Sequence, residues 1–257
     1  METTVVKALT LLEALAFSDG PATLTSLAQT CGQTKSNTHR LLKTLEECRY
    51  VRQDAQARTY EPTLKLWELG TRFFGRSNLR AAAAPHLLAL AKATGESIYL
   101  STIVDDEVIY IDKVESRHAV RTHVEVGHRA PLYCTGTGKA QLAFSSEETI
   151  DRICANLVAY TDNTVTNPTV LRHQLAEIRA RGYATTCGEW RPGVLAHAAP
   201  IRGLAGIAVA GISVVGPEER MRRADAEAQV DALLEAATNI AEALGLTAAE
   251  PVAPAPN

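Results

Sequence analysis

A glycine-rich stretch at residues 134–139, with the sequence CTGTGK, is the first candidate for chemistry, because such loops can cradle a phosphate. The phosphate-loop pattern G-x-x-x-x-G-K-[ST] requires a glycine where this chain has Tyr133 and a hydroxyl where it has Ala140. The preceding Arg129-Ala130-Pro131 also lacks the character of a buried strand. The stretch therefore argues against nucleotide hydrolysis, although backbone N–H groups at a helix start here could hold a carboxylate.

The remaining reactive side chains form no catalytic or metal-binding pattern. His118, His123 and His128 are spaced by five, so they share neither a helix face nor one side of a strand. Cys134 and Cys187 would need a nearby base to act as nucleophiles, and the sequence shows none, so both are interpreted as small buried apolar residues. Glu189, isolated in an apolar region, is interpreted as a loop anchor. The sequence therefore predicts no enzyme, no metal site and no cofactor.

Binding chemistry is more prominent in residues 34–50, TKSNTHRLLKTLEECRY, which fit one amphipathic helix. Its apolar stripe comprises Thr38, Leu41, Leu42, Leu45 and Cys48. The opposite face carries Ser36, His39, Arg40 and Lys43. Taken alone, such a helix is more often a solvated surface helix than a ligand-binding one.

The residues before this helix favour a helix-turn-helix. Residues 5–17 predict a first helix with one apolar face made of Val5, Ala8, Leu9, Leu12, Leu15 and Ala16. After a break at residues 18–21, Thr23 or Thr25 can cap a short helix over residues 24–29. Cys31-Gly32 then gives a tight turn before the basic helix. A short helix, a glycine-containing turn and a longer helix with a basic face are the order of a DNA-binding helix-turn-helix.

A short hairpin is predicted next, with residues 50–53 and 59–61 alternating around a turn at residues 54–58. A hairpin in this position is typical of a wing, with Arg58 near its tip. We expect base edges or adjacent phosphates to be contacted by Gln33, Lys35, Ser36 and Asn37, and one turn later by His39 and Arg40. Lys43 and Arg58 are predicted phosphate contacts, which supply affinity without sequence information.

Composition is compatible with a soluble globular protein that binds DNA through one end. The chain has 257 residues, of which 46% are hydrophobic and 21% charged. Its net charge of −3 divides into +2 over residues 1–76 and −5 over the remainder. Five cysteines without a C-x-x-C pair indicate a reducing compartment, and no apolar run reaches the roughly 20 residues that span a bilayer. We therefore expect a cytoplasmic protein with no membrane contact.

The second half reads as α+β, an antiparallel sheet with helices on its faces. A connecting helix over residues 64–74 is followed by a boundary near residues 76–78 and a helix over residues 79–93, with a kink or restart at Pro85. Strands are expected at residues 97–104, 107–114, 120–126, 183–187, 195–201 and 204–214. Helices are expected at residues 138–144, 147–157, 168–181 and 218–244, before a disordered tail.

Over nearly its whole length the chain resembles the IclR family of bacterial transcriptional regulators. The N-terminal residues that carry the resemblance are VKALTLLEALA, LTSLAQTCGQTKSNTHRLLKTLEECRYV, and Tyr60 with Leu64-x-Leu66-x-x-Leu69-Gly70. The C-terminal ones are Gly127-x-x-x-Pro131-Leu132, TGTGKAQLAF, Arg181-Gly182-Tyr183-Ala184, Glu189-x-x-x-Gly193, Pro200 and Ile212-Ser213-Val214-Val215-Gly216-Pro217. Each motif is weak by itself, but their order and spacing together are specific.

The resemblance implies a winged helix-turn-helix (residues 1–62), a linker helix (63–78), a GAF-like α/β effector-binding and oligomerisation domain with an antiparallel sheet (79–248) and a disordered tail (249–257). Such proteins form homodimers or homotetramers, bind double-stranded operator DNA and respond to a small-molecule effector. The family's pocket positions fall on Ala119, Thr122, Ala130, Gly136, Thr137, Thr186, Val194, Ala196, Ser213 and Val215.

Three of these positions are less polar than in family members that bind small keto acids. Ala196 stands in place of a cysteine, Val215 of a serine and Thr186 of an aspartate. A less polar pocket favours an aromatic or other larger organic acid over glyoxylate or pyruvate. Two alternatives remain at this point: a GAF-like sensor or enzyme domain with an accessory DNA-binding module, and a non-specific nucleoid-type DNA binder.

Overall fold

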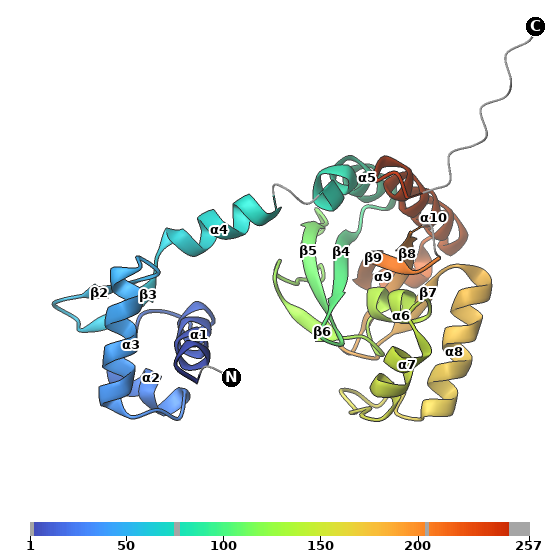
Figure 1. Cartoon of the computed structure of the whole chain (residues 1–257). Helices are drawn as coiled ribbons and strands as arrows, with labels where there is room; N and C mark the ends of the chain where they lie inside the picture. Colours follow the sequence, from blue (N-terminus) through green and yellow to red (C-terminus); the bar gives the residue numbers. More distant parts are fainter. Residues whose placement is uncertain (1–2, 75–77, 204–205, 247–257) are drawn as a thin grey trace, which may run out of the picture. The chain divides into compact units, whose positions relative to one another are not determined.

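The computed structural model describes residues 3–74, 78–203 and 206–246 (Figure 1). It divides into two compact units, Met1–Ser77 and Asn78–Asn257. The predictions for residues 76–77 and for a disordered tail at residues 249–257 lie outside the described residues.

The N-terminal unit is a winged helix-turn-helix, as predicted. Its elements in order are α1 (Thr3–Ala16), β1 (Ala22–Thr23), α2 (Leu24–Thr30), α3 (Lys35–Glu47), β2 (Val51–Asp54), β3 (Thr59–Pro62) and α4 (Leu64–Phe74). The strands form an antiparallel sheet in the order β1-β3-β2. Between α2 and α3, Gly32 adopts a φ of +60°, a conformation that costs glycine little. This turn lets the Gln33 N–H donate to the Ala28 carbonyl at 2.9 Å and redirects the chain into α3.

Seven buried side chains fill the core of this unit: Leu11, Leu15, Leu27, Leu41, Leu42, Val51 and Tyr60. The buried face of α1 is rotated about the helix axis relative to the predicted one. Leu11, which was not predicted, is buried, whereas Val5 and Leu9 are 54% and 53% exposed. Ala16 is exposed as well, and so is Cys48 after the end of α3. Nine of the fourteen residues of α1 are apolar and lie on more than one face, so periodicity alone could not select the buried face.

The C-terminal unit is built on a six-stranded antiparallel sheet in the order β6-β5-β4-β9-β8-β7. The strands are β4 (Ser97–Val104), β5 (Glu107–Val114), β6 (Arg129–Pro131), β7 (Ala184–Cys187), β8 (Val194–Arg202) and β9 (Ala208–Pro217). The helices are α5 (Asn78–Thr94), α6 (Gly136–Leu142), α7 (Glu147–Cys154), α8 (Pro168–Arg181), α9 (Glu218–Arg223) and α10 (Ala226–Ala243). The predicted α+β architecture is confirmed.

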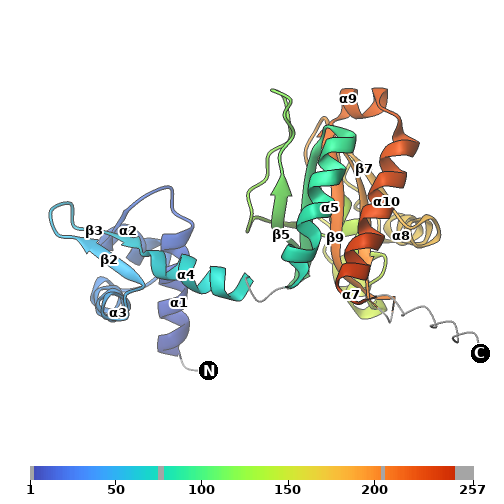
Figure 2. The ribbon, with the colours of Figure 1, turned by 90° about the horizontal axis from the view of Figure 1, so that it is seen from above.

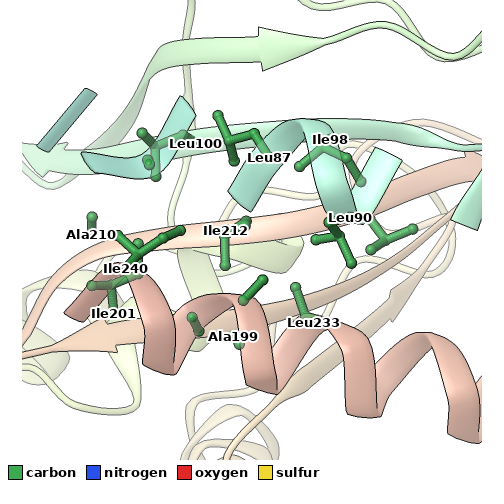
Figure 3. Close-up of a cluster of buried hydrophobic side chains, with 14 of the residues drawn as sticks. Leu87, Leu90, Ile98, Leu100, Ala199, Ile201, Ala210, Ile212, Leu233 and Ile240 are labelled. Carbon is green, nitrogen blue, oxygen red and sulfur yellow. The ribbon is translucent and has the colours of Figure 1, made fainter. Parts of the chain in front are cut away.

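Two helices cover one face of this sheet, and the cover of the other face includes α6. Figure 2 shows α5 and α10 side by side over the strands. Leu87, Leu90, Leu233 and Ile240 of these helices pack against Ile98, Leu100 and Ile212 of the sheet (Figure 3). Because successive strand residues point to opposite faces, Tyr99 and Ser213 lie on the α6 side, between these apolar positions.

The predicted third strand at residues 120–126 was wrong. The segment has no strand partner, and its carbonyl groups accept hydrogen bonds from side chains instead. Tyr99 Oη donates to the Thr122 oxygen at 2.9 Å, and Arg220 Nη1 donates to the Val120 oxygen at 2.9 Å. The strand that pairs with β5 is β6, at Arg129–Pro131. Alternation of side chains predicts an extended chain but not its bonding partners.

Three further boundaries differ from the sequence prediction. The last strand begins at Ala208, so Gly206 and Ile207 are not part of it, and residues 204–205 of the predicted strand lie outside the described residues. The long closing helix is two helices, because Ala224 is extended and the Asp225 carboxylate caps α10 by accepting from the Ala228 N–H. Pro85 lies within a single continuous helix, α5, rather than at a restart.

A buried histidine gives the C-terminal unit a predictable pH dependence. His197 of β8 is 7% exposed, and its Nδ1 lies 3.0 Å from Thr185 Oγ1. Burial, together with nearby Arg181, lowers the pKa of His197 below its usual 6.5. The unfolded chain therefore binds a proton at a higher pH than the folded chain does. Stability should fall as the pH drops below about 6.5, by up to ~1.4 kcal/mol per pH unit.

Chemical denaturation at pH 7.5 and pH 5 measures this effect. The His197→Gln variant should lose less stability on acidification than the wild type. His173→Gln, a change at an exposed histidine of α8, should behave as the wild type does. An unaltered pH dependence in His197→Gln would contradict the assignment.

Among the described residues, none of the helices combines the length and the apolar character required to cross a membrane.

Candidate functional site

The outward face of α3 is polar and basic. Its core-facing stripe, Thr38, Leu41 and Leu42, is buried, while Lys35, Ser36, His39, Arg40 and Lys43 are exposed. Thr34 caps the helix by accepting from the Asn37 N–H at 3.4 Å. No acidic residue lies in the first turn, so the positive end of the helix dipole adds to the basic side chains there.

A run of side-chain hydrogen bonds orients part of this face. Gln33 Nε2 donates to the Lys7 carbonyl of α1 at 3.2 Å, and Asn37 Nδ2 donates to Gln33 Oε1 at 2.8 Å. Arg40 Nη2 donates to Asn37 Oδ1 at 3.2 Å. Gln33 and Asn37 are half-buried, so these two are less available to a ligand than the exposed Arg40.

The C-terminal end of α3 is fastened to the start of α4. Lys65 Nζ donates to the Cys48 carbonyl at 2.8 Å and lies 4.4 Å from the centre of the Tyr50 ring. Thr63 Oγ1 donates to the Arg49 carbonyl at 2.5 Å. These bonds satisfy carbonyl groups left open where α3 ends, so α3 and the first turn of α4 are held together.

The wing is a regular two-stranded hairpin. Arg52 pairs with Glu61 across β2 and β3 at 2.6 Å, in the register that places them opposite each other. Asp54 accepts from the Gln56 and Ala57 N–H groups in the turn. Arg58 follows with a φ of +53° and an exposed side chain.

The C-terminal unit contains a cavity of about 500 Å³ on the α6 side of the sheet, partly open to solvent. Eight of the ten residues predicted from the family pattern line it: Thr122, Gly136, Thr137, Thr186, Val194, Ala196, Ser213 and Val215. Ala119 and Ala130 do not line it. Ala130 is buried in β6 opposite Val108, and Ala119 is an exposed residue of the segment that precedes Val120. Both were expected beside a strand that does not form.

Several lining residues were missed by the sequence reasoning. The largest are the aromatic residues Tyr99, Tyr110 and Trp190, and the cationic ones are Arg121 and Arg191. Tyr99 and Tyr110 lie on neighbouring strands, with ring centroids 5.5 Å apart. Tyr99 lies opposite Ser213, a predicted lining residue, in the pairing of β4 with β9, and only this long-range pairing connects Tyr99 with the predicted site.

The glycine-rich stretch forms the tight start of α6. A Cβ on Gly138 would lie 2.3 Å from the Leu132 carbonyl oxygen, so this position has no room for a side chain. A Cβ on Gly136 would lie 3.0 Å from that of Ala196, because α6 packs closely on β8. The small residues thus bring the start of α6 against the sheet at the cavity.

Lys139 is directed into the protein rather than toward an exposed anion site. Its ammonium lies 2.5 Å from Glu189 Oε2 and donates to Gln174 Oε1 at 2.7 Å. Burial lowers the pKa of Lys139 and raises that of Glu189, while their contact opposes both shifts. The backbone of Glu189 is also anchored, since its carbonyl accepts from Thr164 Oγ1 at 2.6 Å.

Cys134 lines the same cavity but is a poor nucleophile. Burial, reinforced by the negative charge of Glu189, raises its pKa to about 12. The thiol is therefore protonated at neutral pH. Among the described residues, no group of three or more His, Cys, Asp or Glu side chains could hold a metal ion.

The segment at residues 120–126 covers the cavity and is tied to three other elements. Besides the contact from Tyr99, Arg220 of α9 donates to the Val120 carbonyl and forms a two-point ion pair with Glu96 at 2.5 and 2.6 Å. Arg191 Nη1 donates to the His123 carbonyl at 3.3 Å. One side of the cavity is thus covered by an irregular backbone segment that these side chains hold in place.

A winged helix-turn-helix followed by an α/β unit with an internal cavity defines the class of DNA-binding transcriptional regulators. Residues 4–55 match the IclR helix-turn-helix domain, and residues 71–242 match the domain described as bacterial transcriptional regulator IclR C-terminal. The chain belongs to the IclR family.

Individual relatives agree with this membership. The HTH-type transcriptional regulator BhcR of Paracoccus denitrificans is 37% identical over 236 residues, covering 91% of this chain and 84% of the relative. A crystal structure of an IclR-type regulator from Alicyclobacillus acidocaldarius has 31% identity and a TM-score of 0.84, covering 95% and 99% of the two chains. An IclR homologue from Microbacterium hydrocarbonoxydans, solved with 4-hydroxybenzoate, shares the fold with 24% identity and a TM-score of 0.84, covering 95% and 100%.

Proposed function

We propose that this regulator binds a specific operator of a metabolic operon through α3 and the wing, and that a small organic acid in its C-terminal cavity controls this binding. The observation that carries the proposal is the exposed basic face of α3 on a helix whose other face is buried in a core. Recognition helices of this kind insert into the major groove and contact base edges near their N-terminus.

Within this proposal the side chains have separate roles. Lys35, Ser36, His39 and Arg40 contact base edges or adjacent phosphates, whereas Gln33 and Asn37 also orient Arg40 through their hydrogen bonds. Lys43 and Arg58 contact phosphates and supply affinity that falls with salt.

Replacement of Arg40 by alanine should weaken binding to the operator by about 1–3 kcal/mol if its guanidinium contacts a guanine at two points. Binding to unrelated DNA should weaken much less. Lys43→Ala should weaken both kinds of binding alike, because a phosphate contact carries no sequence information. Titrations at matched salt measure these differences, with a change at the exposed Lys92 of α5, Lys92→Ala, as a charge-matched control. An Arg40→Ala protein with wild-type operator affinity would contradict the role of Arg40.

A homodimer or homotetramer is the assembly we propose. Two helices of the N-terminal unit leave large apolar side chains uncovered: Val5 and Leu9 on α1, and Leu64 and Trp67 on α4, the last two 81% and 69% exposed. Apolar surface of this extent favours contact with a second copy. Two copies would place two α3 helices in successive major grooves of a roughly palindromic site.

The effector we propose is an aromatic or other organic acid. The cavity is about 500 Å³, within the usual range for small-molecule sites, and Tyr99, Tyr110 and Trp190 line it. We further propose that α4 transmits the effect, since Lys65 and Thr63 hold its first turn against the end of α3. A ligand can change operator affinity only if it prefers one arrangement of the DNA-binding units.

Sequencing the DNA fragments that the purified protein selects from its own genome tests the proposal. Enrichment of a few fragments with a shared, roughly palindromic sequence is the expected result, and neighbouring genes would indicate the metabolite. Uniform recovery of the genome would contradict a sequence-specific function.

A further inference from the structure

Arg191 differs from the other cations at the cavity in having no carboxylate partner among the described residues. Arg121 is paired with Glu115 at 3.2 Å, and Lys139 with Glu189 at 2.5 Å. His123 lies 2.6 Å from a carboxylate oxygen of Glu125. Arg191 instead donates to the neutral His123 carbonyl at 3.3 Å, and its guanidinium carbon lies 4.4 Å from the centre of the Trp190 ring.

The loop that carries Arg191 is anchored on both sides. Gly188 and Gly193 turn the chain with φ values of +65° and +72°. Between them, the Glu189 carbonyl accepts from Thr164, and the Trp190 ring lies 5.9 Å from that of His128. Stacking on Trp190 limits the rotamers of Arg191 and leaves the edge of the guanidinium free to donate.

The present acceptor of Arg191 is a weak one for a guanidinium. A carboxylate accepts two parallel N–H bonds from arginine at about 2.7–2.9 Å, and bonds to a charged partner are roughly twice as strong as neutral ones. A ligand carboxylate can therefore displace the His123 carbonyl at little cost. That exchange would also release the segment at residues 120–126 from the loop that carries Arg191.

We infer that Arg191 binds the carboxylate of an aromatic monocarboxylic acid whose ring lies in the cavity lined by Tyr99, Tyr110 and Trp190. This inference rests on the proposed function of the cavity as the effector site. One uncompensated guanidinium matches one carboxylate. A second carboxylate deeper in the cavity would meet Glu189 and no further unpaired cation among the described lining residues.

Calorimetric titration of the full-length protein with two pairs of probes tests the assignment. The pairs are 4-hydroxybenzoate with 4-hydroxybenzamide, and benzoate with benzamide, which differ in charge but little in shape. The wild type should bind each acid about 10- to 100-fold more tightly than its amide, as expected for a charged hydrogen-bonded contact. Arg191→Gln should lose this preference by weakening acid binding alone, and Arg191→Lys should retain part of it.

Arg117→Gln is the matched control, because Arg117 is exposed, lies three residues before the covering segment and does not line the cavity. It should keep the wild-type preference for the acids. Equal affinity of the wild type for acid and amide, a preference that persists in Arg191→Gln, or no binding of either acid below about 1 mM would overturn the inference.

Operator binding, measured in the absence of any probe compound, distinguishes a failure of this inference from a failure of the proposed function. The wild type and Arg117→Gln should both bind the selected operator, because Arg117 is exposed and lies outside the cavity. Failure to select any operator would refute the proposed regulatory function while leaving the acid–amide comparison as a test of Arg191.

Discussion

Replacement of Lys139 by methionine is expected to lower the free energy of unfolding of the C-terminal unit by about 3–5 kcal/mol. The side chains of Lys139 and Glu189 are 2% and 10% exposed, and their charged atoms lie 2.5 Å apart. The variant leaves the Glu189 carboxylate buried without its cation, and Gln174 without its donor. The penalty comes mainly from this uncompensated charge rather than from the loss of a favourable ion pair.

Addition of Glu189→Gln to Lys139→Met should recover part of the stability, because the orphaned charge is removed. Denaturant unfolding of the two single variants and the double variant measures the coupling between the residues. Arg223→Ala serves as the surface control. It breaks an ion pair with Glu219 in which both side chains are 78% exposed, so it should hardly change the free energy of unfolding. A loss below about 1 kcal/mol in Lys139→Met without rescue by Glu189→Gln would show that the pair is not buried as described.

Replacement of Leu42 by alanine should cost the N-terminal unit about 2–5 kcal/mol. Leu42 is fully buried in a core of seven residues, and small domains have little stability in reserve. We expect the unit to unfold in a large fraction of molecules and DNA binding to be lost. Hydrogen exchange should show loss of protection in α1–α3 and unchanged protection in α5 and α10.

Leu88→Ala removes the same atoms from a half-exposed position of α5 and should change stability by less than about 0.5 kcal/mol. Wild-type DNA affinity and α1–α3 protection in Leu42→Ala would contradict the assigned core.

Short-range signals predicted much of the fold. The hairpin of β4 and β5 followed from two apolar runs joined by Asp105-Asp106, which adopt φ values of +52° and +64° in the turn. The turn before α3 followed from Gly32. The helix predicted at residues 168–181 is α8, whose bounds the structure explains by the Asn167 cap, Pro168 at the start and the left-handed Gly182 at the end. These features are local, so each is encoded within a few residues.

The features that the sequence did not predict depend mainly on contacts with residues far away in the chain. The segment at residues 120–126 forms no strand. Tyr99 and Arg220 donate to its carbonyl groups from positions 23 and 100 residues away, and no local pattern reveals such partners. The break before α10 depends on the Asp225 cap, a signal that was present but overlooked. The buried face of α1 was undetermined because apolar residues occupy more than one face of that helix.

The cavity residues likewise fall into those that the sequence predicted and those that only the structure reveals. The family pattern correctly predicted small residues that line the cavity, such as Gly136 and Ala196. That pattern does not contain Trp190 and Arg191, and their relevance depends on a contact with His123 across the mouth of the cavity. The features expected to set ligand preference are therefore the ones that the family motifs do not encode.

Sequence-specific DNA binding is tested most directly by titrating the full-length protein against one selected genomic fragment and a shuffled fragment of equal composition, at about 0.15 M salt. The exposed face of α3 predicts an affinity for the selected fragment at least about 10³-fold higher, as for other specific DNA-binding proteins. Equal affinity for both fragments, with the same dependence on salt, would contradict a regulator that reads its operator.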